Sequence, residues 1–87
     1  MIDKVYTFLR KAWEDENILY ITSMMGLFSA NQQIEDYEIV KGKEVIEIIG
    51  EEHTYWCIRC SRFHSCFEST EMIQLRDGEN LLEIRLG

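Results

Sequence analysis

Three cysteines and two histidines lie close together in the stretch HTYWCIRCSRFHSC, which covers residues 53–66. Thiolate and imidazole groups are ligands that zinc prefers in proteins, and four of them complete a structural zinc site. One hypothesis is therefore a small binding module that is stabilised by zinc. Its ligands would be drawn from His53, Cys57, Cys60, His64 and Cys66.

The same stretch is also typical of β-structure, because aromatic and β-branched side chains favour strands. In a strand, Trp56, Ile58 and Cys60 would share one face while Cys57 would lie on the other. Neither a zinc ion nor a disulfide could then join Cys57 to Cys60. A zinc-binding Cys-x-x-Cys turn usually contains glycine or proline, and this pair encloses Ile58 and Arg59. We therefore favour structural cysteines in two strands joined by a turn near residues 61–62, with no metal or cofactor.

Catalytic signatures are missing from the sequence. It contains no glycine-rich phosphate loop, no His-Glu-x-x-His pair and no Gly-x-Ser-x-Gly elbow. Redox or nucleophilic chemistry at a cysteine requires a stabilised thiolate, for example at a helix N-terminus, and nothing in the pattern starts a helix at Cys57. We expect a protein that is not an enzyme.

Charge is the strongest global feature of the chain. The 87 residues include 16 acids and 9 lysines and arginines, a formal net charge of −7. Ten of the acids and only two lysines lie within residues 14–52, so this span carries −8 and the two flanks together carry +1. Nucleic acid is a poor ligand for such a surface, because phosphate binding depends on lysine and arginine. A basic surface of another protein is the better match.

The sequence thus predicts a small acidic interaction protein, a regulator or inhibitor, that docks on a basic surface of its partner. That surface could itself be one that binds nucleic acid, in which case the carboxylates would stand where phosphates lie. A simpler alternative is that the charge only keeps the protein soluble. The candidate partner-binding residues are Glu35, Asp36, Glu38, Glu44, Glu47, Glu51 and Glu52.

A helix is expected at the start of the chain, over residues 2–16. Its apolar side chains, Ile2, Val5, Tyr6, Leu9 and Trp13, recur at the spacing that lines one helical face. A short strand is expected at about residues 18–23, followed by an irregular or helical stretch.

Two hairpins are predicted from alternating patterns around glycine. In the first, a turn at Gly42-Lys43 with positive φ at the glycine would pair Ile39 with Ile46 and Glu38 with Glu47. The facing glutamates would repel each other unless a partner of opposite charge lay between them. In the second hairpin, a turn at residues 78–79 would pair residues 73–76 with residues 81–84 in antiparallel register.

The predicted architecture is a single α+β domain over residues 1–87, with the helix packed on an antiparallel sheet of about five or six strands. The longest apolar segment, at residues 18–30, is too short and too polar to span a membrane, so we expect a soluble protein without a membrane partner. An odd number of cysteines fits a reducing compartment, which indicates a cytoplasmic location. Exposed sheet edges make a homodimer a further hypothesis.

Overall fold

The computed structural model describes residues 2–25 and 28–87, beginning with one α-helix, α1 (Ile2–Glu14). The buried side chains of α1 are Ile2, Val5, Leu9 and Ala12, which follow a spacing of three and four residues. The predicted helical face is confirmed at Ile2, Val5 and Leu9. Trp13 was placed wrongly, because Ala12 takes the inward position and Trp13 is 40% exposed. Its ring instead packs edge-on against Tyr37, with the centroids 5.3 Å apart.

The helix ends two residues earlier than predicted, at a left-handed residue. Glu16 has φ of 57°, its N–H donates to the carbonyl of Trp13, and the N–H of Asn17 donates to the carbonyl of Ala12. This pair of hydrogen bonds is the Schellman arrangement, which closes a helix by satisfying its last carbonyls. Glycine usually occupies the left-handed position, so a glutamate there gave no sequence signal for the helix end.

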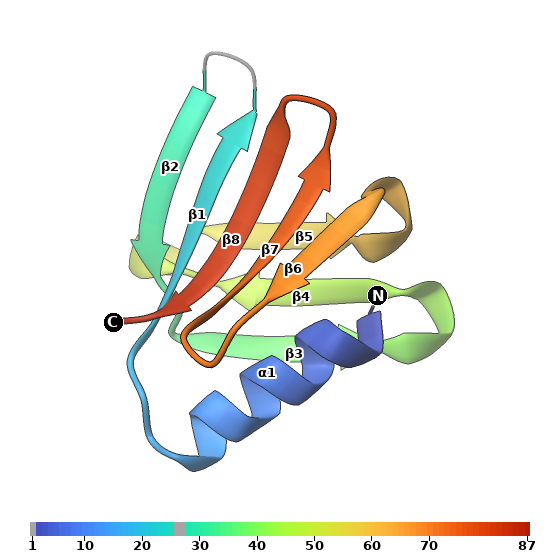
Figure 1. The fold of residues 1–87 in the computed structure, drawn as a ribbon. Helices are drawn as coiled ribbons and strands as arrows, with labels where there is room; N and C mark the ends of the chain where they lie inside the picture. The colour runs from blue at the N-terminus through green and yellow to red at the C-terminus, as the bar shows by residue number, and fades with distance from the viewer. Residues whose placement is uncertain (1, 26–27) are drawn as a thin grey trace.

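The described residues form eight strands in two antiparallel sheets (Figure 1). The larger sheet has the order β2-β1-β8-β7-β6, and the smaller has the order β3-β4-β5. The strands are β1 (Leu19–Met25), β2 (Phe28–Gln33), β3 (Asp36–Val40), β4 (Val45–Ile49), β5 (Tyr55–Arg59), β6 (Ser65–Glu68), β7 (Met72–Asp77) and β8 (Asn80–Leu86). The α+β class and the helix packed on an antiparallel sheet of about five or six strands are confirmed, since the larger sheet has five strands. The separate three-stranded sheet was not predicted.

The first part of the larger sheet was only partly predicted. The strand expected at residues 18–23 is β1, which continues to Met25, and β2 pairs with it where an irregular or helical stretch was expected. Residues 26 and 27 of that stretch lie outside the described residues. The sequence of β2 is polar and includes Asn31, Gln32 and Gln33, so it did not indicate a strand. β2 lies at the edge of the sheet, where a strand needs few apolar side chains.

Both predicted hairpins have the expected register. β7 and β8 pair around a turn at residues 78–79, in which Gly78 has φ of 58°. β3 and β4 pair Ile39 with Ile46 and Glu38 with Glu47. The first turn was predicted wrongly, since a 3-10 helix, η1 (Lys41–Lys43), makes it and the left-handed residue is Glu44, with φ of 52°.

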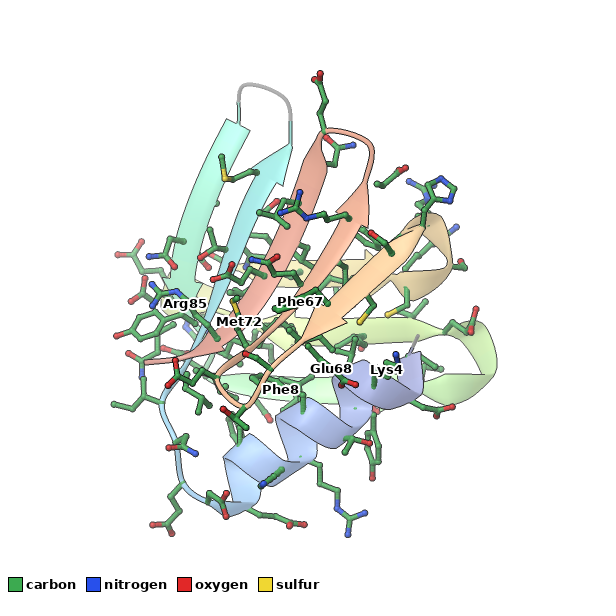
Figure 2. All side chains as sticks on the ribbon, in the orientation of Figure 1. Lys4, Phe8, Phe67, Glu68, Met72 and Arg85 are labelled. Carbon is green, nitrogen blue, oxygen red and sulfur yellow. The ribbon has the colours of Figure 1, made fainter. Side chains whose placement is uncertain are left out.

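The core lies between the two sheets, whose strands run in crossed directions, and α1 lies beside β3 and the lower ends of β6 and β7 (Figure 1). Side chains on the inner faces fill it, and each is at most 6% exposed: Ile21, Ile46, Ile48, Ile58, Ile73, Leu75, Leu82 and Ile84. The face of the larger sheet that points away from the core carries Phe67, Met72 and Arg85 (Figure 2). The radius of gyration is 11.9 Å, close to the roughly 12 Å of a compact chain of this length.

Candidate functional site

The outer face of the three-stranded sheet holds the best-organised group of charged side chains that was predicted from the sequence. Strand pairing aligns its residues in three rows across β3, β4 and β5. The rows are Asp36, Ile49 and Tyr55; Glu38, Glu47 and Cys57; and Val40, Val45 and Arg59. We call these nine residues the outer face. Acidic, apolar and aromatic side chains therefore lie next to one another on a rigid sheet.

A hollow of about 220 Å³ lies over the first two rows of the outer face. Three carboxylates reach it, and apolar and aromatic side chains complete its wall. Its lining residues are Asp36, Tyr37, Glu38, Glu47, Ile49 and Tyr55. The like-charged pair of Glu38 and Glu47 sits directly across from one strand to the next, where cross-strand neighbours are closest. This arrangement concentrates negative charge at one point of the face.

Tyr55 interacts with the carboxylates of Glu47 and Glu38. Its side chain hydrogen-bonds to Glu47, and this bond is the main cause that raises the pKa of Tyr55 to about 12. Loss of solvation and the negative charges of Glu47, Cys57 and Glu38 act in the same direction. The phenol therefore stays protonated at neutral pH, and its O–H donates a hydrogen bond to the Glu47 carboxylate. This bond holds the Glu47 carboxylate at the Tyr55 side of the hollow.

The other predicted acids lie around the outer face rather than in the hollow. The N–H of Glu35 donates to the carbonyl of Ile49 at 2.8 Å, which places Glu35 at the end of the sheet where Asp36 lies. Glu51 and Glu52 follow Gly50 at the same end, in the 3-10 helix η2 (Glu51–His53), and both are exposed.

Glu44 is separated from this group, because it precedes β4 at the opposite end of the hairpin. Six of the seven predicted acids thus surround one end and one face of the smaller sheet, while Glu44 does not belong with them.

Three residues that line the hollow, Tyr37, Ile49 and Tyr55, were not predicted as site residues. Ile49 is 40% exposed and Tyr55 is 58% exposed, and strand pairing places the two side by side. The sequence did place Ile49 on the face of Glu38 and Glu47, but it gave no pairing between residues 45–49 and residues 55–59. The pairing of β4 with β5, which a five-residue connection joins, places Tyr55 next to Ile49.

The cysteine stretch forms strand β5, the 3-10 helix η3 (Cys60–Arg62) and strand β6, as the β-structure interpretation predicted. Cys57 is exposed on the outer face, whereas Cys60 is 1% exposed in the core. Burial is the main cause that raises the pKa of the Cys60 thiol to about 11, and burial also raises the pKa of Cys66. Cys60 is therefore a protonated core side chain at neutral pH.

The five possible zinc ligands are not brought together. Within residues 2–25 and 28–87, no group of three or more histidine, cysteine, aspartate or glutamate side chains is arranged to hold a metal ion. His53 and Cys60 lie at opposite ends of β5, and Cys66 belongs to the other sheet. The His64 Nε2 atom lies 3.2 Å from the Asp77 Oδ1 atom.

In the part of the chain that the structure describes, no helix is both long and apolar enough to cross a membrane.

Comparison with known proteins identifies no relative. No model of a known protein family matches the chain, and neither a curated protein nor a solved structure matches it significantly.

Proposed function

We propose that the protein is a non-enzymatic interaction protein whose outer face docks on a basic surface of a partner protein. The observation that supports this proposal is the hollow formed by Asp36, Glu38, Glu47, Ile49 and Tyr55. Its carboxylates attract a cationic side chain, and its apolar walls suit the methylene stem of lysine or arginine. In this role the protein acts as a regulator or inhibitor in the cytoplasm, where its three free thiols stay reduced.

The electrostatics of the hollow favour an arginine or lysine as the docking residue. Glu38 and Glu47 repel each other in the free protein, so a cation between them removes an unfavourable contact and adds two favourable ones. The ring of Tyr55 lines the same hollow and offers cation–π contact. Binding is therefore expected to weaken as salt is added, since part of the attraction acts between exposed charges.

The surrounding acids extend the attraction beyond the hollow. Glu35, Glu51 and Glu52 are exposed at the end of the sheet next to Asp36. Charges of one sign steer a partner of opposite sign and raise its association rate. A groove that normally binds nucleic acid is one such partner surface, because it is lined by lysine and arginine.

Reversal of the central charge pair tests the proposal. We expect the double variant Glu38→Lys/Glu47→Lys to lose binding to a short arginine-rich peptide and to protein partners that the wild-type chain captures. Chemical-shift changes in the labelled protein report the peptide, and they should map to β3, β4 and Tyr55. The matched control is Glu14→Lys/Asp15→Lys, which changes the net charge equally but alters the exposed end of α1.

Two results would contradict the proposal. One is equal loss of binding in both double variants, which would show that only net charge matters. The other is unchanged binding in Glu38→Lys/Glu47→Lys with its fold intact. Competition with a short DNA duplex for a captured partner then tests whether the partner surface is one that binds nucleic acid.

A further inference from the structure

Strand β5 has one edge that no other strand occupies. In the described residues it pairs only with β4. The N–H of Cys60 donates to the carbonyl of Glu44, so the even-numbered residues direct their backbone groups toward β4. By the alternation of an antiparallel ladder, the N–H and C=O groups of Tyr55, Cys57 and Arg59 point to the open edge. Such an edge is a template for a further strand.

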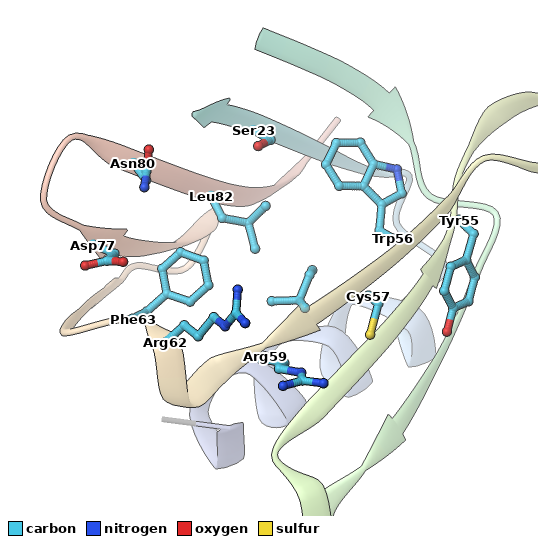
Figure 3. Close-up of a pocket in the computed structure, with 11 residues that line it drawn as sticks. Ser23, Tyr55, Trp56, Cys57, Arg59, Arg62, Phe63, Asp77, Asn80 and Leu82 are labelled. Atoms are coloured by element: carbon cyan, nitrogen blue, oxygen red, sulfur yellow. The ribbon is translucent and has the colours of Figure 1, made fainter. Parts of the chain in front are cut away.

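A pocket of about 570 Å³ runs along this open edge. Figure 3 shows Trp56, Phe63 and Leu82 on the pocket side of β5, with Cys57 and Tyr55 on the other side. Ser23 and Leu82 come from the inner face of the larger sheet and are buried. The larger sheet therefore extends past β5, and the pocket lies where a fourth strand of the smaller sheet would fit, about 4.8 Å from β5.

The polar lining of the pocket favours a negatively charged group. Arg62 lines it, and its guanidinium makes no hydrogen bond or ion pair within the described residues. Among the described residues that line the pocket, Asp77 is the only one with a carboxylate, and it already contacts His64. The lining thus carries two arginines, Arg59 and Arg62, against one carboxylate, although the chain as a whole has a net charge of −7. It fits a carboxylate on the occupant, because arginine forms paired hydrogen bonds with carboxylates.

We propose that this groove binds an extended segment of a partner protein, which adds to β5 as a fourth strand. Alternate side chains of the segment face Trp56 and Leu82, and an acidic side chain lies beside Arg62. Backbone hydrogen bonds to the open edge supply affinity and the side-chain positions supply selectivity, as in other cases of strand addition. This proposal does not depend on the docking role of the outer face.

A second copy of the chain fits the groove less well than a single segment. Antiparallel pairing of two β5 strands would place both larger sheets on the same side of the joined sheet. Each larger sheet already extends over the groove next to its own β5, as the shared lining by Leu82 and Trp56 shows. The two copies would therefore compete for the same space, whereas an isolated segment needs only one strand width.

A synthetic peptide provides the test. The probe is a seven-residue peptide, acetylated at its N-terminus and amidated at its C-terminus, that alternates valine and threonine and ends in glutamate. We expect its binding to shift the amide resonances of Tyr55, Cys57 and Arg59 and to slow their hydrogen exchange. A peptide ending in lysine should bind about tenfold more weakly, since it loses a charged hydrogen bond to Arg62. A peptide that is N-methylated on its β5-facing amides should not bind.

Variants of the chain test the same geometry from the protein side. Cys57→Pro removes an N–H that faces the open edge and leaves the β4 ladder intact, as proline in an edge strand does. It should abolish peptide binding, while the matched control Cys57→Ser binds like the wild-type chain. Arg62→Glu should reverse the preference between the glutamate and lysine peptides. The Glu38→Lys/Glu47→Lys variant should bind the glutamate peptide normally, which separates this groove from the outer face.

Several outcomes would overturn the proposal. Equal binding of the N-methylated peptide would show that the open edge is not used. Chemical-shift changes confined to other elements would also show that the open edge is not used. The absence of binding by any of the peptides would show the same. A wild-type dimer in solution whose Tyr55, Cys57 and Arg59 amides are protected without peptide would assign the edge to a second copy instead.

Discussion

The two faces of the three-stranded sheet differ although they alternate along the same strands. The inner face packs against the larger sheet, and Ile46 and Ile48 are fully buried there. The outer face begins one residue away, yet Glu47 and Ile49 meet acids and a tyrosine across the strands. Strand alternation therefore separates the face of the sheet that is packed in the core from the face that stays exposed to solvent.

This difference shows where apolar side chains serve folding and where they do not. Ile48 and Ile49 have the same chemistry, but only Ile48 is removed from water by the fold. The exposed Ile49 and Tyr55 contribute little to the core and remain on the surface next to carboxylates.

The largest expected effect is on stability, when the two neighbouring isoleucines are truncated separately. Ile48→Ala should lower the free energy of unfolding by about 2–5 kcal/mol, because it leaves a cavity in the core. Ile49→Ala should lower it by less than about 1 kcal/mol. Chemical denaturation of both variants measures the difference. Equal losses would mean that the outer face is also covered in the folded protein.

The two neighbouring cysteines should differ in reactivity toward a thiol reagent. Exposed Cys57 should react in the native protein, whereas buried Cys60, whose pKa is raised to about 11 from its usual 9.0, should react only on unfolding. The raised pKa also links stability to pH. Its contribution is complete below pH 9, where the thiol is protonated in both states, and is lost as pH rises from 9 to about 11.

Mass spectrometry of labelled peptides assigns the reacting thiol. Cys60→Ala is the control for the pH dependence and should remove this alkaline loss of stability. Rapid labelling of Cys60 at neutral pH without unfolding would place it outside the core and would contradict the strand assignment.

A smaller effect is expected for the titration of Tyr55. The ultraviolet absorbance of phenolate should show one tyrosine with a pKa of about 12, and Glu47→Gln should move it toward the usual 10.0, because the hydrogen bond to a carboxylate is lost. The interaction favours the folded state below pH 10 and is lost as pH rises to about 12. The titration that disappears in the Tyr55→Phe variant is the one that belongs to Tyr55. No change in Glu47→Gln would show that Glu47 does not hold the phenol.

The smallest effect should be a gain in stability on the outer face. Glu38→Gln removes the repulsion between Glu38 and Glu47 and should raise the free energy of unfolding by about 0.2–1 kcal/mol. Glu79→Gln, in the exposed β7–β8 turn, makes the same chemical change away from that pair and is the control. Thermal unfolding at low salt compares the two. Equal gains in both variants would indicate an effect of net charge rather than of the facing pair.

The α+β class, the amphipathic helix and the registers of both hairpins could be predicted from the sequence, because they depend on local periodicity. The alternation of Tyr37, Ile39, Ile46 and Ile48 excludes a one-residue slip, which would move these side chains to the other face, and the short turn around Gly42 selects among the remaining registers. The opposite orientation of Cys57 and Cys60 follows in the same way from their odd spacing in a strand. The acids of the outer face were predicted because they alternate with these core residues.

Only the tertiary structure decided how these elements combine. The division into two sheets depends on long-range pairing such as that of β1 with β8, which no local pattern specifies. The same is true of the hollow, since Tyr55 joins Glu47 through the pairing of β4 with β5, and of the groove, since its walls come from opposite sheets. Side-chain periodicity fixes which face a residue takes, whereas the partner across that face depends on how the whole core is packed.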